Sequence, residues 1–113
     1  MTDRVGFCVL YRFRVRDGEE AAFVSAWTEL THGIRDQRGG LGSRLHRDDD
    51  GTFVAYAQWP DRATWQRAQE LPSVDPVASE RMARTMTESF SPILLTPGED
   101  LLERLPAGPA SLE

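Results

Sequence analysis

The segment from residue 5 to residue 15 alternates two kinds of side chain with a period of two. Val, Phe and Tyr occupy the odd positions, whereas the even positions change from apolar, at Cys8 and Leu10, to charged, at Arg12 and Arg14. Because successive side chains of a strand point to opposite faces, this pattern predicts a long strand with one apolar face. The strand is expected to begin inside the protein and to run towards solvent.

A long helix is predicted to follow this strand. Four large apolar residues recur at spacings of four, three and four and therefore share one helical face: Phe23, Trp27, Leu30 and Ile34. Asp17, with an acidic residue three positions later, is expected to cap the first turn. Gly39 and Gly40 are expected to end the helix.

Two further strands are predicted at 41–47 and 52–59. They flank an acidic run, 48–50, and Gly51, and an Asp-Gly pair between two strand-like segments indicates a hairpin. We interpret the acidic run as a solvated turn, because adjacent aspartates are not spaced to converge on a cation.

The second half of the chain predicts a broken helix and a last strand. Asp61 can cap a helix that contains Trp65, and Pro72 and Pro76 interrupt the helical pattern. A spacing of four then predicts one buried helical stripe: Val74, Ala78, Met82, Met86 and Phe90. Residues 89–96 are predicted to form the last strand, and a short terminal helix is predicted around Leu101, Leu102 and Leu105.

The predicted order is strand, helix, strand, strand, helix, strand, which is the split βαβ arrangement of ferredoxin-like α+β folds. Two helices would cover one face of a four-stranded antiparallel sheet and leave the other face bare. Apolar residues on a bare face favour pairing with a second copy, so we expect a homodimer that closes a dimeric α/β barrel. We assign residues 1–105 to this single domain and 106–113 to a C-terminal tail.

Composition argues against several functional classes. The net charge is −5, the Arg residues are scattered and Lys is absent, which disfavours nucleic acid and anionic membranes as partners and excludes Schiff-base chemistry. Cys8 cannot form an internal disulfide and lies in an apolar run, so we interpret it as a small core residue of a cytoplasmic protein. His32 and His46 have no ligand-spaced partners, so no metal site is predicted.

The chain resembles the antibiotic biosynthesis monooxygenase family, whose members are dimeric α/β-barrel proteins, over roughly residues 4–97. The layout carries most of the resemblance, and its most specific local feature is the strand end at 55–62 (AYAQWPDR), which is followed by a helix with Trp65. The resemblance implies a Trp beside the pocket at this turn. It also implies one of several activities: oxygenation of electron-rich aromatic polyketides without metal or flavin, heme degradation, or isomerisation.

The chain departs from two patterns that the resemblance implies. Many relatives place a His in the helix after the Trp, where this chain has Gln69. The heme-degrading branch has an Asn on the first strand and a His in a later helix, and those positions fall at Tyr11 and near Ala78. Since an axial ligand for iron is missing there, heme degradation is the least supported activity.

We expect a pocket between the sheet and the helices that ends at Trp59. The candidate residues for binding a small aromatic or apolar molecule are aromatic residues and polar neighbours: Tyr11, Trp27, Arg44, His46, Tyr56, Trp59, Trp65 and Gln69. Strand parity places Ala55, Ala57 and Trp59 on one face and Tyr56 on the other. The small alanines leave room for a ligand or for an incoming helix. Structural roles are open as well: core packing for Trp27, and simple exposure for His46 and Gln69.

Taken with these residues, the resemblance implies a cofactor-independent monooxygenase, or a related enzyme, that uses molecular oxygen on a polyketide- or quinol-like aromatic with no metal or other cofactor. Arg44 or His46 is expected to stabilise a phenolate, and no residue is assigned as acid or base. The alternative is a non-catalytic dimeric protein that binds a small ligand, because the family His is missing.

Overall fold

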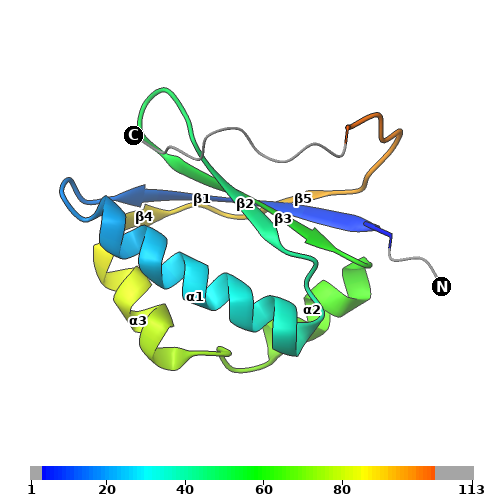
Figure 1. Cartoon of the computed structure of the whole chain (residues 1–113), viewed down its shortest axis with the longest axis horizontal. Helices are drawn as coiled ribbons and strands as arrows, with labels where there is room; N and C mark the ends of the chain where they lie inside the picture. The colour runs from blue at the N-terminus through cyan, green and yellow to red at the C-terminus, as the bar shows by residue number, and fades with distance from the viewer. Residues whose placement is uncertain (1–3, 104–113) are drawn as a thin grey trace.

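The computed structural model describes residues 4–103, which form one antiparallel sheet with three helices on one face (Figure 1). The strands are β1 (Phe7–Val15), β2 (Ser43–Arg47), β3 (Phe53–Trp59), β4 (Met86–Ser89) and β5 (Ile93–Leu95). The helices are α1 (Glu20–Arg38), α2 (Arg62–Glu70) and α3 (Pro76–Thr85). The predicted ferredoxin-like α+β architecture is confirmed. We call the helix-covered side of the sheet the inner face and the other side the outer face.

Strand β1 lies at the centre of the sheet, whose order is β2-β3-β1-β4. On one side β1 pairs with β3 in a register that runs from Phe7 opposite Trp59 to Phe13 opposite Phe53. On its other side it pairs with β4 near Val15 and with β5 near Cys8 to Leu10. The last strand therefore starts earlier than the predicted 89–96 and is divided in two. Pro92, which has no N–H to donate, lies at the division.

Helix α1 confirms the predicted long helix, but its first turn is capped differently. The Glu20 carboxylate accepts a hydrogen bond from the backbone N–H of Gly18 at 2.9 Å, and the N-cap residue Glu19 makes no side-chain cap bond. The prediction that Asp17 caps this helix is therefore wrong. At the other end Gly39 has a φ of 84° and stops the helix as predicted.

The predicted broken helix corresponds to α2 and α3. Asp61 and Asp75 each accept a hydrogen bond from a backbone N–H three residues later, which satisfies an amide at each helix start. The predicted helical stripe is wrong at both ends, because Val74 precedes α3 and because Met86, after Thr85, is extended and pairs with Val15 in the sheet. The four-residue spacing could not predict this change from helix to strand, because Met86 continues the spacing although it belongs to β4.

The predicted terminal helix is wrong for the described part of the chain. Residues 96–103 contain no helix, and the side chains of Leu101 and Leu102 are exposed. Leu105 and the tail 106–113 lie outside the described residues, so the domain boundary stays a prediction.

The buried core consists of two groups of side chains along the inner face. One group contains Phe13, Phe23, Phe53 and Ala55. The other contains Phe7, Val9 and Trp59. Tyr11 packs against both groups and therefore joins the two halves of the core.

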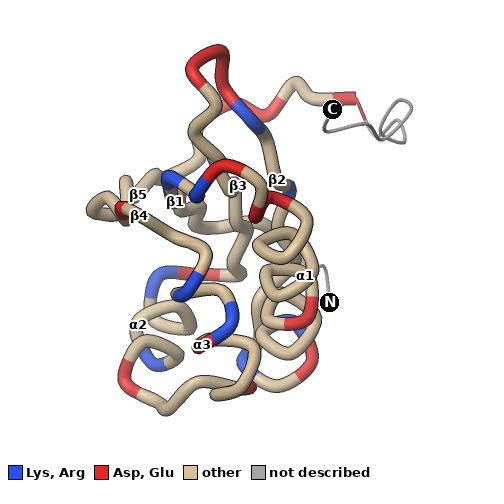
Figure 2. The backbone as a smooth tube through the Cα atoms, turned by 90° about the vertical axis from the view of Figure 1, so that its left-hand side faces the viewer, with Lys and Arg blue, Asp and Glu red and all other residues tan. Residues whose placement is uncertain are grey.

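The charged positions follow the predicted pattern. Figure 2 places acidic positions together on the β2–β3 loop and mixes basic with acidic positions along the helices. In this loop the Asp48 carboxylate accepts hydrogen bonds from the backbone N–H groups of Asp50 and Thr52, as expected for a turn. Within residues 4–103, the helices are too short or too polar to span a membrane.

Gly6 brings the start of β1 into contact with the turn after β3, and this contact is testable. Its N–H donates to the Trp59 carbonyl at 3.0 Å, and a Cβ at Gly6 would collide with the backbone carbonyl of Pro60. We predict that Gly6→Ala lowers the free energy of unfolding by about 2 kcal/mol in urea denaturation. Gly98→Ala is the matched control, because a Cβ there meets no atom within 4 Å. Equal stability of the two variants would contradict the close contact.

Candidate functional site

A cavity of about 300 Å³ lies between the inner face of the sheet and the helices. We call it the central cavity. The inner face of β3 carries two alanines, Ala55 and Ala57, between the large residues Phe53 and Trp59. Since the alanines have little volume, the facing side chains of α1 do not fill the space above them, and the cavity remains open.

The walls of the central cavity are mainly apolar and aromatic. They include Tyr11, Trp27, Leu30, Ile34, Trp59 and Met82, which come from β1, α1, β3 and α3. A second cavity of about 270 Å³ adjoins it beneath the linker between α2 and α3. Both cavities share several lining residues: Tyr11, Leu30, Ile34, Trp59 and Gln69. Their volumes lie at or just below the lower end of those of small-molecule sites.

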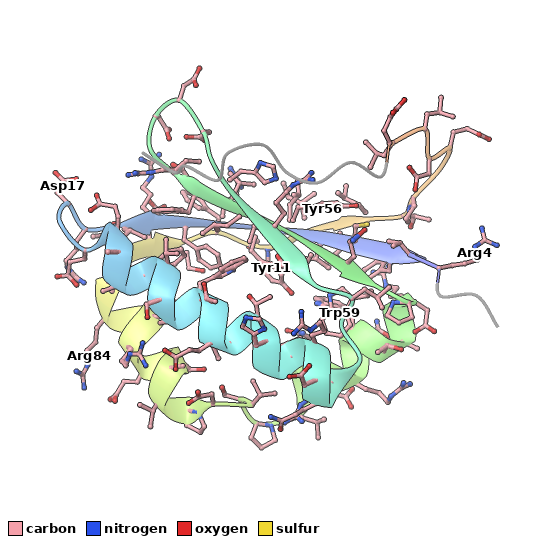
Figure 3. The ribbon with its side chains drawn as sticks, viewed as in Figure 1. Arg4, Tyr11, Asp17, Tyr56, Trp59 and Arg84 are labelled. Carbon is pink, nitrogen blue, oxygen red and sulfur yellow. The ribbon has the colours of Figure 1, made fainter. Side chains whose placement is uncertain are left out.

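Tyr11 is placed on β1 between the sheet and the helices (Figure 3). Its hydroxyl oxygen accepts a hydrogen bond from Nε1 of Trp65 on α2 at 2.9 Å. Burial raises the pKa of the Tyr11 phenol, and the bond from Trp65 lowers it by less. The phenol therefore keeps its proton at neutral pH and acts as a hydrogen-bonding group rather than as a base.

Trp59 closes one end of the central cavity. Its side chain is only 3% exposed, and its Nε1 has no hydrogen-bond partner in the described part of the chain. The indole packs close to Gly40, where a Cβ would stand 3.6 Å from the Trp59 ring and 3.1 Å from a methyl group of Ile34. The loop after α1 thus comes near enough to fix the ring in place.

The polar groups of the central cavity are few. Thr31 and Ser43 donate their hydroxyl protons to the backbone carbonyls of Trp27 and Tyr56, at 2.8 and 2.9 Å. Arg35 lies at the rim with a half-exposed side chain and contacts the Nδ1 atom of His32 at 3.0 Å. Among the described residues, the cavity lining contains no carboxylate, imidazole, thiol or amine, so it offers no ordinary proton acceptor.

The structure brings four of the predicted binding residues together at the central cavity: Tyr11, Trp27, Trp59 and Gln69. Trp65 reaches this site through its hydrogen bond to Tyr11. Tyr56, Arg44 and His46 lie elsewhere. All three lie on the outer face, because residues that pair directly across two strands point to the same face. Arg44 pairs with Tyr56, and His46 pairs with Val54. Arg44 and His46 are therefore not placed to stabilise a phenolate in this cavity, which corrects that expectation.

The outer face carries its own contacts. The Tyr56 hydroxyl lies 3.2 Å from the buried Cys8 sulfur, and Figure 3 places Tyr56 on the side of the sheet away from Tyr11. Arg44 Nε donates to His46 Nε2 at 3.0 Å in an exposed position. On the other side of β1, Ile93 and Leu95 of β5 pair with Leu10 and Cys8 and leave apolar side chains 41% and 36% exposed.

Sequence reasoning missed several lining residues. Leu30 and Ile34 were predicted only as a helical core face, and Met82 only as part of a buried stripe. Thr31 and Arg35 flank this face of α1 and are polar, so the apolar pattern does not include them. Their spacing of four residues, one turn along the helix beside the apolar stripe, is the signal that could have identified them.

The described residues contain no group of three or more His, Cys, Asp or Glu side chains that could hold a metal ion.

The sequence profile of the antibiotic biosynthesis monooxygenase family matches residues 6–75. No protein of curated function matches the chain significantly. Among solved structures, the chain is similar to SnoaB of Streptomyces nogalater, described as a cofactor-independent oxygenase, with a TM-score of 0.71 and 24% identity over 88% of this chain and all of that chain (100%).

Two other solved structures are similar as well. A protein of Mycobacterium tuberculosis has a TM-score of 0.66 and 16% identity, over 85% of this chain and 98% of that chain. A protein of Pseudomonas aeruginosa has a TM-score of 0.64 and 19% identity, over 88% of this chain and 100% of that chain. At these identities the similarity establishes a shared fold.

The two tyrosines of the chain report on the two faces of the sheet. The hydrogen bond with Cys8, aided by burial, raises the pKa of Tyr56 to about 12. Burial raises the pKa of Tyr11 above its ordinary value of 10.0. We predict that alkaline titration, followed by tyrosinate absorbance, gives no transition near pH 10 and that Tyr11→Phe leaves one transition near 12.

The sign of the pH dependence follows from these raised pKa values. The stability that the two neutral phenols contribute is present below pH 10 and is lost as pH rises through their raised pKa values, which for Tyr56 is about 12. Near-ultraviolet circular dichroism checks that the protein is still folded at each pH. A tyrosinate midpoint near 10 in the folded protein would contradict the burial of Tyr11.

Proposed function

Because the chain belongs to the antibiotic biosynthesis monooxygenase family, we propose that its central cavity binds a small polyketide- or quinol-like aromatic and promotes its oxygenation by O₂. One observation carries this proposal: a cavity of about 300 Å³ with aromatic walls lies between sheet and helices and ends at Trp59. The proposed chemistry uses no protein-bound metal or flavin. We keep the cytoplasm as the expected location.

The proposed reaction balances without a further reductant. In an anthrone, a methylene carbon loses two hydrogens and becomes a carbonyl. One oxygen atom of O₂ enters that carbonyl, and the other leaves with both hydrogens as water. The deprotonated substrate supplies the electrons, so the protein needs to bind the ring, favour its anion and exclude bulk water.

The lining residues suit these tasks. Trp27 and Trp59 provide aromatic surfaces for a planar ring, and such contacts add about 1 kcal/mol beyond buried area. The positive charge of Arg35 at the rim favours an anionic substrate. Since the lining holds no ordinary proton acceptor, an acidic substrate is expected to lose its proton to bulk water before it binds as the anion. No catalytic acid or base is assigned.

The same shortage of proton acceptors supports the second candidate function, a non-catalytic dimeric protein that stores or senses a small ligand. The two candidates differ in one observable property, because both bind the aromatic and only the enzyme consumes oxygen. Heme degradation has less support, since Tyr11 stands at the position expected for an Asn and the fully buried Ala78 lies near the position expected for a His. Titration with hemin is expected to give no shift of the Soret band of free hemin.

We also propose that the outer face pairs with the same face of a second copy. Leu10, Val54 and Tyr56 form a partly buried apolar centre there, and Ile93 and Leu95 extend it at the sheet edge. Such a pairing would remove this apolar surface from water. Because the central cavity lies on the inner face, each cavity would still be formed by a single protomer.

Filling the central cavity tests the proposed activity. Ala57→Leu places a larger side chain in the cavity beside Trp59, and we predict that it lowers oxygen uptake with an anthrone at least about tenfold. Ala63→Leu on α2 is the matched control, because Ala63 is exposed and does not line the cavity, and it should retain full activity.

Each outcome of this experiment separates the candidates. Wild-type protein that binds the anthrone in calorimetry without consuming oxygen would support the non-catalytic binding protein. Wild-type protein that neither binds nor consumes oxygen across a panel of phenols, quinols and anthrones would contradict both.

The dimer has its own test in sedimentation equilibrium. We predict a mass of about twice 12.7 kDa for the wild type and one near 12.7 kDa for Ile93→Arg, because the exposed Ile93 would lie in the interface. Val77→Arg is the matched control, since Val77 is 66% exposed on α3, away from the outer face, and should leave the dimer intact. A monomeric wild type would end the proposal.

A further inference from the structure

Three hydroxyl groups line the central cavity, and they differ in whether their protons are free. Thr31 donates its proton to the Trp27 carbonyl, and Ser43 donates its proton to the Tyr56 carbonyl. The Tyr11 oxygen instead accepts a hydrogen bond, because the indole Nε1–H of Trp65 can only donate. Tyr11 is therefore the lining hydroxyl whose own proton stays available.

Trp65 also sets the direction of that proton. A phenol oxygen that accepts one hydrogen bond presents its O–H group away from the incoming donor. Trp65 belongs to α2 and is not itself part of the cavity lining, whereas Tyr11 lines both cavities. The bond from α2 thus leaves the Tyr11 O–H free for an acceptor in the cavity.

We infer that Tyr11 determines ligand specificity by donating a hydrogen bond to a carbonyl oxygen of the bound aromatic, and that Trp65 is its positioning residue. This inference rests on the proposed ligand site, but not on catalysis at that site. Because the cavity walls are apolar, one directed donor discriminates between ligands that differ in a single acceptor oxygen.

Trp59 also lines the cavity, but its Nε1–H is buried and has no partner in the described part of the chain, so this donor is not exposed to a ligand in the cavity. The free O–H group of Tyr11 is therefore the donor that favours ketones and quinones over hydrocarbons.

The test compares two rigid probes with the same three-ring skeleton, 9-fluorenone and fluorene, which differ in one carbonyl oxygen. Wild-type protein should bind 9-fluorenone about fivefold to tenfold more tightly than fluorene, the range that one neutral hydrogen bond provides. In Tyr11→Phe this ratio should fall to about one while fluorene binds as before, because only the hydroxyl is lost. In Trp65→Phe the ratio should fall part of the way, since the hydroxyl loses its fixed direction.

Two further variants keep the result interpretable. The double variant Tyr11→Phe/Trp65→Phe removes both partners of this hydrogen bond and so leaves no unpaired indole N–H. It is therefore expected to fold even if Tyr11→Phe alone does not fold. Its ratio of the two affinities should also be near one. Tyr56→Phe is the matched control, because its hydroxyl lies on the outer face against Cys8, and its ratio should equal that of the wild type.

The outcomes separate this inference from the proposed site. If wild-type protein binds neither probe, the ligand site itself is wrong. If both probes bind and removal of the Tyr11 hydroxyl leaves the ratio unchanged, the site stands and the role of Tyr11 is overturned. That role is also overturned if Tyr56→Phe abolishes the preference for the ketone.

Discussion

The pairing of β1 with β3 is the constraint on which the rest of the structure depends. Its register places Tyr11 opposite Ala55 and Phe7 opposite Trp59, and the two alanines of β3 lie between the large residues Phe53 and Trp59 on the inner face. A shift of β3 by one residue against β1 would turn Ala55, Ala57 and Trp59 to the outer face and bring Tyr56 inside. The alanines that leave the central cavity open and the indole that lines it would be lost together.

The sheet separates two tasks by its two faces. The inner face, covered by α1, α2 and α3, encloses the cavity in which we propose that an aromatic ligand binds (Figure 1). The outer face carries apolar side chains suited to a second copy, and Leu10, Val54 and Tyr56 on it do not line that cavity. Since the ligand site needs no residue from the proposed interface, dimer formation and ligand binding can be altered independently.

The sequence was informative wherever a local rule decides the structure. The period of two in β1, the apolar face of α1, the stop at Gly39 and the cap at Asp61 all depend on near neighbours, and each was predicted correctly. Asp17 failed as a cap because Glu20 reaches back to the same turn, and Met86 failed as a helical residue because Val15 recruits it into the sheet. Within the site, parity separated Trp59 from Tyr56, whereas the bond between Tyr11 and Trp65 joins residues far apart in the chain, which no spacing predicts.

A crystal structure of the protein soaked with a tricyclic aromatic ketone tests the central claim most directly. We expect the ring system between Ala57 and α1, against the indole of Trp59, with a carbonyl oxygen within hydrogen-bond distance of the Tyr11 hydroxyl. A ligand bound on the outer face, or a central cavity filled by the protein's own side chains, would contradict the account.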